Sequence, residues 1–134
     1  MSLSTFRIGG DAAEEKAPNG ALRLATVRFL PRGLSEAERK KRDLYDVWLP
    51  LLAPSAELLA WAKKQGFPQT DNITAWKKFS ERFAREMSAS AEKREALKMV
   101  ALLARRTDVS IGCYCADESH CHRSVLKKLI EGAG

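Results

Sequence analysis

The residues best suited to chemistry lie in one window near the C-terminus, from Cys113 to Ser124, with the sequence Cys-Tyr-Cys-Ala-Asp-Glu-Ser-His-Cys-His-Arg-Ser. This window contains all three cysteines and both histidines of the chain. Thiolates act as nucleophiles, imidazoles exchange protons near neutral pH, and the guanidinium fork of arginine matches carboxylate or phosphate. The window is therefore the first candidate for a reactive or ligand-binding site.

The spacing within the window suggests roles for its members. An apolar stretch over 108–115 predicts a strand, and a helix is predicted to begin near Cys121. Backbone N–H groups at a helix start attract anions and lower the pKa of a thiol placed there. We therefore predict Cys121 as a reactive thiol, His122 or Glu118 as an acid/base group and Arg123 as an anion ligand.

Metal binding is a competing interpretation of the same window. Thiolates and imidazoles are typical zinc ligands, and four suffice for a tetrahedral site. Zinc sites usually combine two well-separated ligand pairs, whereas all candidates here share one window. The residue types therefore favour zinc, but their spacing does not. If a metal is bound, the expected ligands are Cys113, Cys115, His120 and Cys121, with His122 as a further candidate. Otherwise Cys113, inside an apolar strand, is expected to be a small core residue.

A second group of cations follows another predicted strand, at 22–29. Arg28 and Arg32 flank Phe29-Leu30-Pro31 at its end. If the two strands are parallel neighbours, these arginines and Arg123 meet at one sheet edge and form an anion pocket. The alternative is that Arg28 and Arg32 pair with nearby carboxylates and only connect loops; the candidate partners are Asp43, Asp46 and Glu118.

The elements that must position these residues indicate an α/β fold. Alternation predicts a short edge strand at 6–8 in addition to the strands at 22–29 and 108–115. Capping patterns predict helices beginning at Ser35, at Ser55 and near 88–90, and apolar stripes predict helices around 76–87 and 125–130. The segment 44–54, with two prolines, is expected to be broken helix or irregular structure. We predict one domain over 1–134 with a small, mostly parallel sheet of about three strands and five or six helices, residues 1–4 being an added or disordered terminus.

Composition and charge limit the class of partner. The chain has 134 residues, a net charge of +6 and no apolar run long enough to cross a membrane, which favours a cytoplasmic protein. A positive field favours an anionic partner, either a small ligand or nucleic acid. The basic run Arg39 to Arg42 is expected to be a solvated helix face that could also contact phosphates, and the stripe Trp76, Phe79, Phe83 and Met87 is expected to be core.

Three blocks of the chain resemble the domain-of-unknown-function family numbered 488, including its YeaO-like branch. They are Arg28-Phe29-Leu30-Pro31-Arg32-Gly33, the run from Asp46 to Ser55, and the cysteine-rich segment ending in Cys121-His122-Arg123. The resemblance spans most of the chain from Asn19 onward and implies a compact α/β domain with cytoplasmic location. It also implies that Cys115 and Glu118 belong with Cys121, His122 and Arg123 to the characteristic residues. The branch commonly has Asn-His-Ala where this chain has Cys-His-Arg, and Leu-Trp in place of Phe29-Leu30.

Three functional hypotheses follow. The first is a protein that binds, and could act enzymatically on, a small anionic or nucleotide-like ligand, held by Arg28, Arg32, Arg123 and Cys115. The second is a nucleic-acid-binding or regulatory module without catalysis, and the third is a structural zinc site. The sequence requires no cofactor and does not decide whether a reaction is catalysed.

Overall fold

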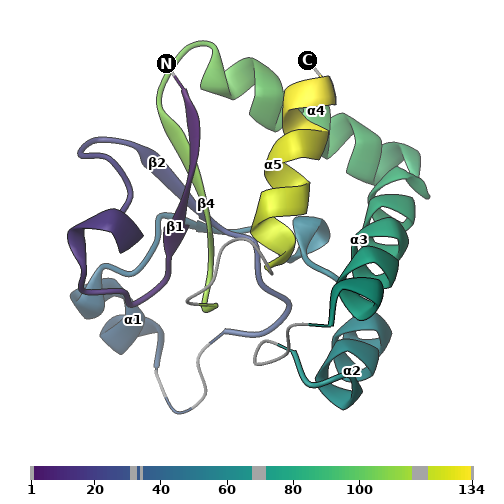
Figure 1. Cartoon of the computed structure of the whole chain (residues 1–134). Helices are drawn as coiled ribbons and strands as arrows, with labels where there is room; N and C mark the ends of the chain where they lie inside the picture. The colour runs from purple at the N-terminus through teal and green to yellow at the C-terminus, as the bar shows by residue number, and fades with distance from the viewer. Residues whose placement is uncertain (1, 31–32, 34, 68–71, 116–120, 134) are drawn as a thin grey trace.

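Four parallel strands form the centre of the molecule (Figure 1). They are β1 (Leu3–Arg7), β2 (Leu22–Ala25), β3 (Val47–Trp48) and β4 (Val109–Cys113), in the spatial order β1-β4-β2-β3. The computed structural model describes residues 2–30, 33, 35–67, 72–115 and 121–133. All five residues of β4 are buried, as expected for a central strand with a neighbour on each side.

Five α-helices surround this sheet, and their ends follow the capping signals in the sequence. They are α1 (Glu36–Arg42), α2 (Ala56–Lys64), α3 (Ile73–Ser88), α4 (Ala91–Ala104) and α5 (His122–Ala133). Side chains of Ser35, Ser55, Asn72 and Ser90 each accept a hydrogen bond from a backbone N–H in the first turn of α1 to α4. In Figure 1, α3, α4 and α5 lie together on one side of the strands and α1 lies at the other side.

The main core lies between the sheet and the helices α2 to α5. Phe79, Phe83 and Met87 on α3 are at most 5% exposed and pack with Ile111 of β4 and Leu126 of α5. The aromatic stripe is therefore core, as predicted. A second cluster continues toward the carboxyl ends of the strands and contains Phe6, Ile8, Ala25, Val27, Cys113 and Cys121.

The predicted α/β class and the small parallel sheet are confirmed, but three details were wrong. Leu3 and Ser4 belong to β1, where the Ser4 hydroxyl donates to Ser110 Oγ at 3.0 Å, so these residues are not a disordered terminus. The strand predicted over 22–29 ends at Ala25. Beyond it, the Val27 carbonyl oxygen accepts a hydrogen bond from Trp48, and the Arg28 side chain donates to the segment that follows β3.

The third correction concerns the segment 44–54. The segment expected to be broken helix contains β3, a two-residue edge strand, before the 3-10 turn Pro50–Leu52. A strand this short has too few residues to show alternation. It pairs with β2 at two positions, Val47 beside Leu24 and Trp48 beside Ala25. Within the described part of the chain, no helix is both long and apolar enough to cross a membrane.

Candidate thiol site

The chain's reactive groups gather where β4 ends and α5 begins. Cys113 is the last residue of β4, Cys115 follows two positions later, and Cys121 and His122 stand at the start of α5. Gly112 allows this close arrangement, because a Cβ at that position would lie 2.4 Å from the ring of Phe6. The parallel sheet thus places these residues at its carboxyl edge, where ligands of α/β proteins usually bind.

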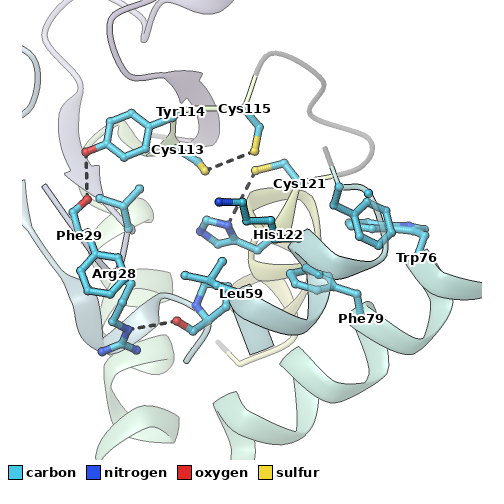
Figure 2. Close-up of a pocket in the computed structure, with 16 residues that line it drawn as sticks. Arg28, Phe29, Leu59, Trp76, Phe79, Cys113, Tyr114, Cys115, Cys121 and His122 are labelled. Carbon is cyan, nitrogen blue, oxygen red and sulfur yellow. Dashed lines mark hydrogen bonds between the residues drawn. The ribbon is translucent and has the colours of Figure 1, made fainter. Parts of the chain in front are cut away.

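A cavity of about 630 Å³ opens onto this edge (Figure 2). Its walls come from the end of β2, from α2, from α3 and from the thiol segment, and most of them are apolar. The apolar lining residues are Val27, Phe29, Pro54, Leu59, Ala62, Phe67, Trp76 and Phe79. Cys113, Cys115, Cys121 and His122 also line it, together with Tyr114 and the two cations Arg28 and Lys63.

The three thiols interact with one another, and Cys115 is the most accessible of them. Cys113 is 6% exposed and Cys121 is 2% exposed, whereas Cys115 is only partly buried. The Cys113 thiol donates to Cys115 Sγ across 3.8 Å. Hydrogen bonds from Cys113 and Cys121 lower the pKa of Cys115 to about 3, against the opposing effect of partial burial, and the charge of Arg123 acts in the same direction as the bonds. Cys115 is therefore the thiol that this environment favours as a thiolate.

The same contacts act in the opposite direction on the other two thiols. The neighbouring sulfur of Cys115 is the main reason why the pKa of Cys113 rises to about 11. The pKa of Cys121 rises well above its ordinary value, because Cys113 and Cys115 disfavour a second negative charge and the side chain is buried. The helix start was predicted to lower the pKa of Cys121, and this prediction is wrong because these contacts raise it. Cys115 was not singled out for reactivity, although its place just beyond the strand end was the available signal.

His122 is held by the backbone rather than by solvent. Its Nε2 lies 2.6 Å from the Thr26 carbonyl oxygen, so that nitrogen carries the proton and donates it. The other ring nitrogen, Nδ1, is then free to accept from the Cys121 thiol at 3.8 Å. Burial lowers the pKa of His122 to about 4, so the imidazole is neutral at physiological pH. This arrangement orients Cys121 and leaves His122 6% exposed.

Arg123 lies beneath the thiols rather than on the cavity wall. It is 4% exposed, and its Nη1 donates to the carbonyl oxygens of Phe6, at 3.1 Å, and Cys113, at 3.3 Å. Its buried Nε has no hydrogen-bond partner among the residues that the structure describes. Within the described residues no carboxylate forms an ion pair with it. Its positive charge is therefore directed toward the end of β4 and toward Cys115.

Of the second predicted group of cations, Arg28 and Arg32, the structure describes only Arg28. Arg28 lines the cavity, and its guanidinium donates to the carbonyl oxygens of Pro54 and Ala53, both at 3.1 Å. The alternative in which it pairs with Asp43 or Asp46 is wrong, because Arg23 bonds both carboxylates. Arg32, Glu118 and His120 lie outside the described residues. Anion binding by Arg28 and Arg123 stays a prediction.

The described part of the window also contains a set of groups that could hold a metal ion. The donor atoms of Cys113, Cys121 and His122 all lie within 4.8 Å of one another. Within the described residues these are three ligands, one fewer than a tetrahedral zinc site needs. Of the predicted set, Cys115 lies outside this trio, and the trio includes His122 in its place.

The comparisons with known proteins give one match. A family model described as the active DUF488-N3 subclade matches residues 5–134, nearly the whole chain. No curated protein and no solved structure shows significant similarity to the chain. The match includes the thiol segment, α5 and the strands that position them. The chain therefore belongs to the DUF488 family.

Proposed function

We propose that this protein is an enzyme whose Cys115 sulfur acts as a nucleophile toward a small anionic ligand bound in the adjoining cavity. The observation that carries the proposal is the thiol cluster itself. The buried Cys113 thiol donates toward Cys115, a more accessible sulfur that borders a cavity of about 630 Å³, and the buried Cys121 lies beside the two. Such donors stabilise negative charge on the accessible sulfur, and the thiolate is the nucleophilic form of cysteine.

The lining of the cavity supports an aromatic or otherwise planar ligand that also carries negative charge. Phe29, Phe67, Trp76 and Phe79 offer ring surfaces, and Trp76 and Phe79 stack with centroids 5.5 Å apart. Apart from the Cys115 thiolate, the charged groups among the described lining residues are Arg28 and Lys63, both cationic. A nucleotide-like molecule combines these two properties, and its size suits a cavity of this volume.

The proposed step is a nucleophilic substitution. The Cys115 sulfur donates an electron pair to an electrophilic carbon or phosphorus of the ligand, and a covalent bond forms to that atom. The bond from the same atom to its leaving group breaks, and the leaving group departs with its electron pair. Cys113 and Cys121 stay protonated during this step, since their pKa values are raised.

The test uses an aromatic, anionic electrophile, 4-(chloroacetamido)benzoate, with plain chloroacetamide as the reference reagent. We expect saturable, single-site modification of Cys115 by the aromatic reagent, located by peptide mapping, and none in Cys115→Ser. Lys63→Glu should weaken the saturation, because Lys63 lines the cavity, whereas Lys64→Glu on the neighbouring position should not. Equal rates for the two reagents, or modification first at Cys121, would overturn the proposal.

The experiment must also distinguish a nucleophilic Cys115 from a metal site at the same cluster. If protein purified without chelator contains stoichiometric zinc, and zinc removal is needed before Cys115 reacts, the cluster is a metal site and the proposal fails. If metal content is far below one ion per chain and modification proceeds, nucleophilic chemistry at Cys115 is supported.

A further inference from the structure

We infer that the surface beside the cavity binds single-stranded nucleic acid, with bases stacking on Phe29, Trp48 and Tyr114. These three side chains are called the aromatic rim below. The inference deepens the proposed function, because it makes the nucleotide that enters the cavity part of a strand. The inference rests on exposed aromatic rings that lie beside α1, a helix that ends in cationic side chains.

The rim is unusual in its exposure. Phe29 is 62% exposed, Trp48 is 42% exposed and Tyr114 is 38% exposed. Large aromatic side chains gain from burial, so several exposed together mark an interaction surface more often than a single one does. The edge strand β3, which carries Trp48, also exposes Val47.

The polar atoms of the rim are bonded to the protein, which fixes the rings. Trp48 Nε1 donates to the Val27 carbonyl oxygen at 2.8 Å, and the Tyr114 hydroxyl donates to the Phe29 carbonyl oxygen at 3.1 Å. Both bonds therefore end on one short segment, 27–29, which itself lines the cavity. Figure 2 shows Tyr114 directed at Phe29 above the cavity. The Trp48 and Tyr114 rings are thus held through their polar atoms rather than through their faces, which stay available for stacking.

The charge beside the rim suits a phosphate backbone. Helix α1 ends in four consecutive cations, Arg39 to Arg42, and Lys40, Lys41 and Arg42 are exposed. Arg39 lies close enough to Tyr114 for its charge to oppose the rise of that residue's pKa. The carboxylates of Asp43 and Asp46, which follow the helix, are already bonded to Arg23. The C-terminal half of α1 therefore presents mostly positive charge near the rim.

These features together match single-stranded nucleic acid better than duplex. Non-specific binding of single strands combines cationic contacts to phosphates with stacking of bases on aromatic side chains. In a duplex the base faces are already stacked on one another, so the rim would have nothing to bind. The cavity that begins at Phe29 and Tyr114 can then accept one base of the bound strand.

The test measures binding of a fluorescein-labelled 15-nucleotide oligothymidylate by anisotropy, with the same sequence in duplex form as the comparison. We expect the full chain to prefer the single strand, and log K to fall with log salt with a slope of about −2 if three phosphates are contacted. Phe29→Ala and Trp48→Ala should each weaken binding by roughly 5- to 150-fold, the range for loss of one stacked base. Phe29 is 62% exposed and Trp48 is 42% exposed, so neither is a core residue and circular dichroism should show unchanged folding.

Matched controls come from α4, on another part of the molecule. Met99→Ala removes an apolar side chain that is 58% exposed, and it should leave binding unchanged. Lys40→Glu with Lys41→Glu should weaken binding and reduce the salt slope, whereas Lys98→Glu should do neither. Tighter binding to the duplex, or equal affinity of the Phe29→Ala, Trp48→Ala and wild-type proteins, would overturn the inference.

A last variant separates this inference from the proposed function. Trp48→Ala serves this purpose, because Trp48 belongs to the rim and does not line the cavity. Loss of oligonucleotide binding with saturable alkylation of Cys115 retained supports both sites, whereas retained binding overturns the inference and leaves the proposed function standing.

Discussion

Two arginines show how differently this fold treats a positive charge. Arg23 lies on β2 and bonds the carboxylates of Asp43 and Asp46, at 2.6 and 3.0 Å. Arg123 lies under the thiol site, deeply buried, and bonds only backbone carbonyl oxygens within the described residues. Glu15, whose pKa the charge of Arg123 helps to lower, is hydrogen-bonded to Arg7 instead.

The difference teaches what each region is for. Arg23 connects β2 to the segment around β3, and the two carboxylates that it bonds neutralise its charge. A buried cation without such a match is costly unless something nearby gains from it. In the thiol site the group that gains is Cys115, whose negative form is stabilised by Cys113, Cys121 and Arg123. We expect variants of the thiol site to change reactivity, and variants of the Arg23 cluster to change stability only.

The largest predicted effect comes from removing the thiol donors. In Cys113→Ala with Cys121→Ala, the Cys115 pKa should return toward the ordinary value of a free thiol. Its alkylation rate should then rise by about 10³-fold between pH 5 and pH 8, because the thiolate fraction grows tenfold per pH unit. The wild-type rate should change less than about twofold over that range. Peptide-mapped alkylation across pH measures both, and parallel profiles would contradict the account.

The second effect tests Arg123 directly. Arg123→Met removes the donor to the carbonyl oxygens of Phe6 and Cys113 and should cost about 3 kcal/mol in the free energy of unfolding. It should also raise the pKa of Cys115, since a favourable charge is lost. Urea unfolding and the alkylation profile measure these quantities. Unchanged Cys115 titration in a folded Arg123→Met protein would show that the charge does not act on the thiol.

The third effect is a pH dependence that arises from His122. Burial lowers its folded-state pKa to about 4 from an ordinary value of 6.5, so the unfolded chain binds this proton more readily. Stability from this source is complete above the unfolded pKa and falls as pH drops toward the folded one. We expect it to contribute about 2 kcal/mol of the loss between pH 7 and pH 5.

The control for this prediction is His122→Gln, which keeps a donor for the Thr26 carbonyl oxygen but does not titrate. The difference in unfolding free energy between pH 7 and pH 5 should be smaller in the variant than in wild type by that amount. If both proteins lose stability equally, the imidazole is not buried in its neutral form.

The smallest effect belongs to the other side of the comparison. Arg23→Met should reduce stability by only about 1 kcal/mol, because its partners are partly exposed to water. The loss should shrink at high salt, and the Cys115 alkylation profile should not change. A shift of that profile would mean that the two regions are coupled.

Much of the fold could be predicted because it is determined locally. Serine caps mark where α1, α2 and α4 begin, and the spacing of Phe79, Phe83 and Met87 identifies the buried face of α3. Strand β3 could not be predicted, since two exposed residues pair with β2 only through contacts distant in sequence. The early end of β2 has the same origin, because Arg28 bonds to Pro54 and Ala53.

The site could be located from the sequence but not fully assigned. All the thiols fall in one window, and their position at the end of a strand follows from periodicity. Which thiol is ionised depends on burial and on donors that converge in space, and the helix-start argument favoured Cys121. The aromatic walls of the cavity come from segments far away in sequence, Phe67 just after α2 and Trp76 on α3, and Trp76 had been assigned only to the core.

The central claim is that Cys115 carries a thiolate at neutral pH while Cys113 and Cys121 do not. Thiolate absorbance near 240 nm, measured across pH as the difference between wild type and Cys115→Ser, tests this most directly. The account predicts that the difference is already present at pH 6, persists at pH 5 and disappears only as the pH falls through about 3, since the pKa of Cys115 is lowered to about 3. A difference that appears only above pH 8 would contradict it, because Cys115 would then titrate as an ordinary thiol.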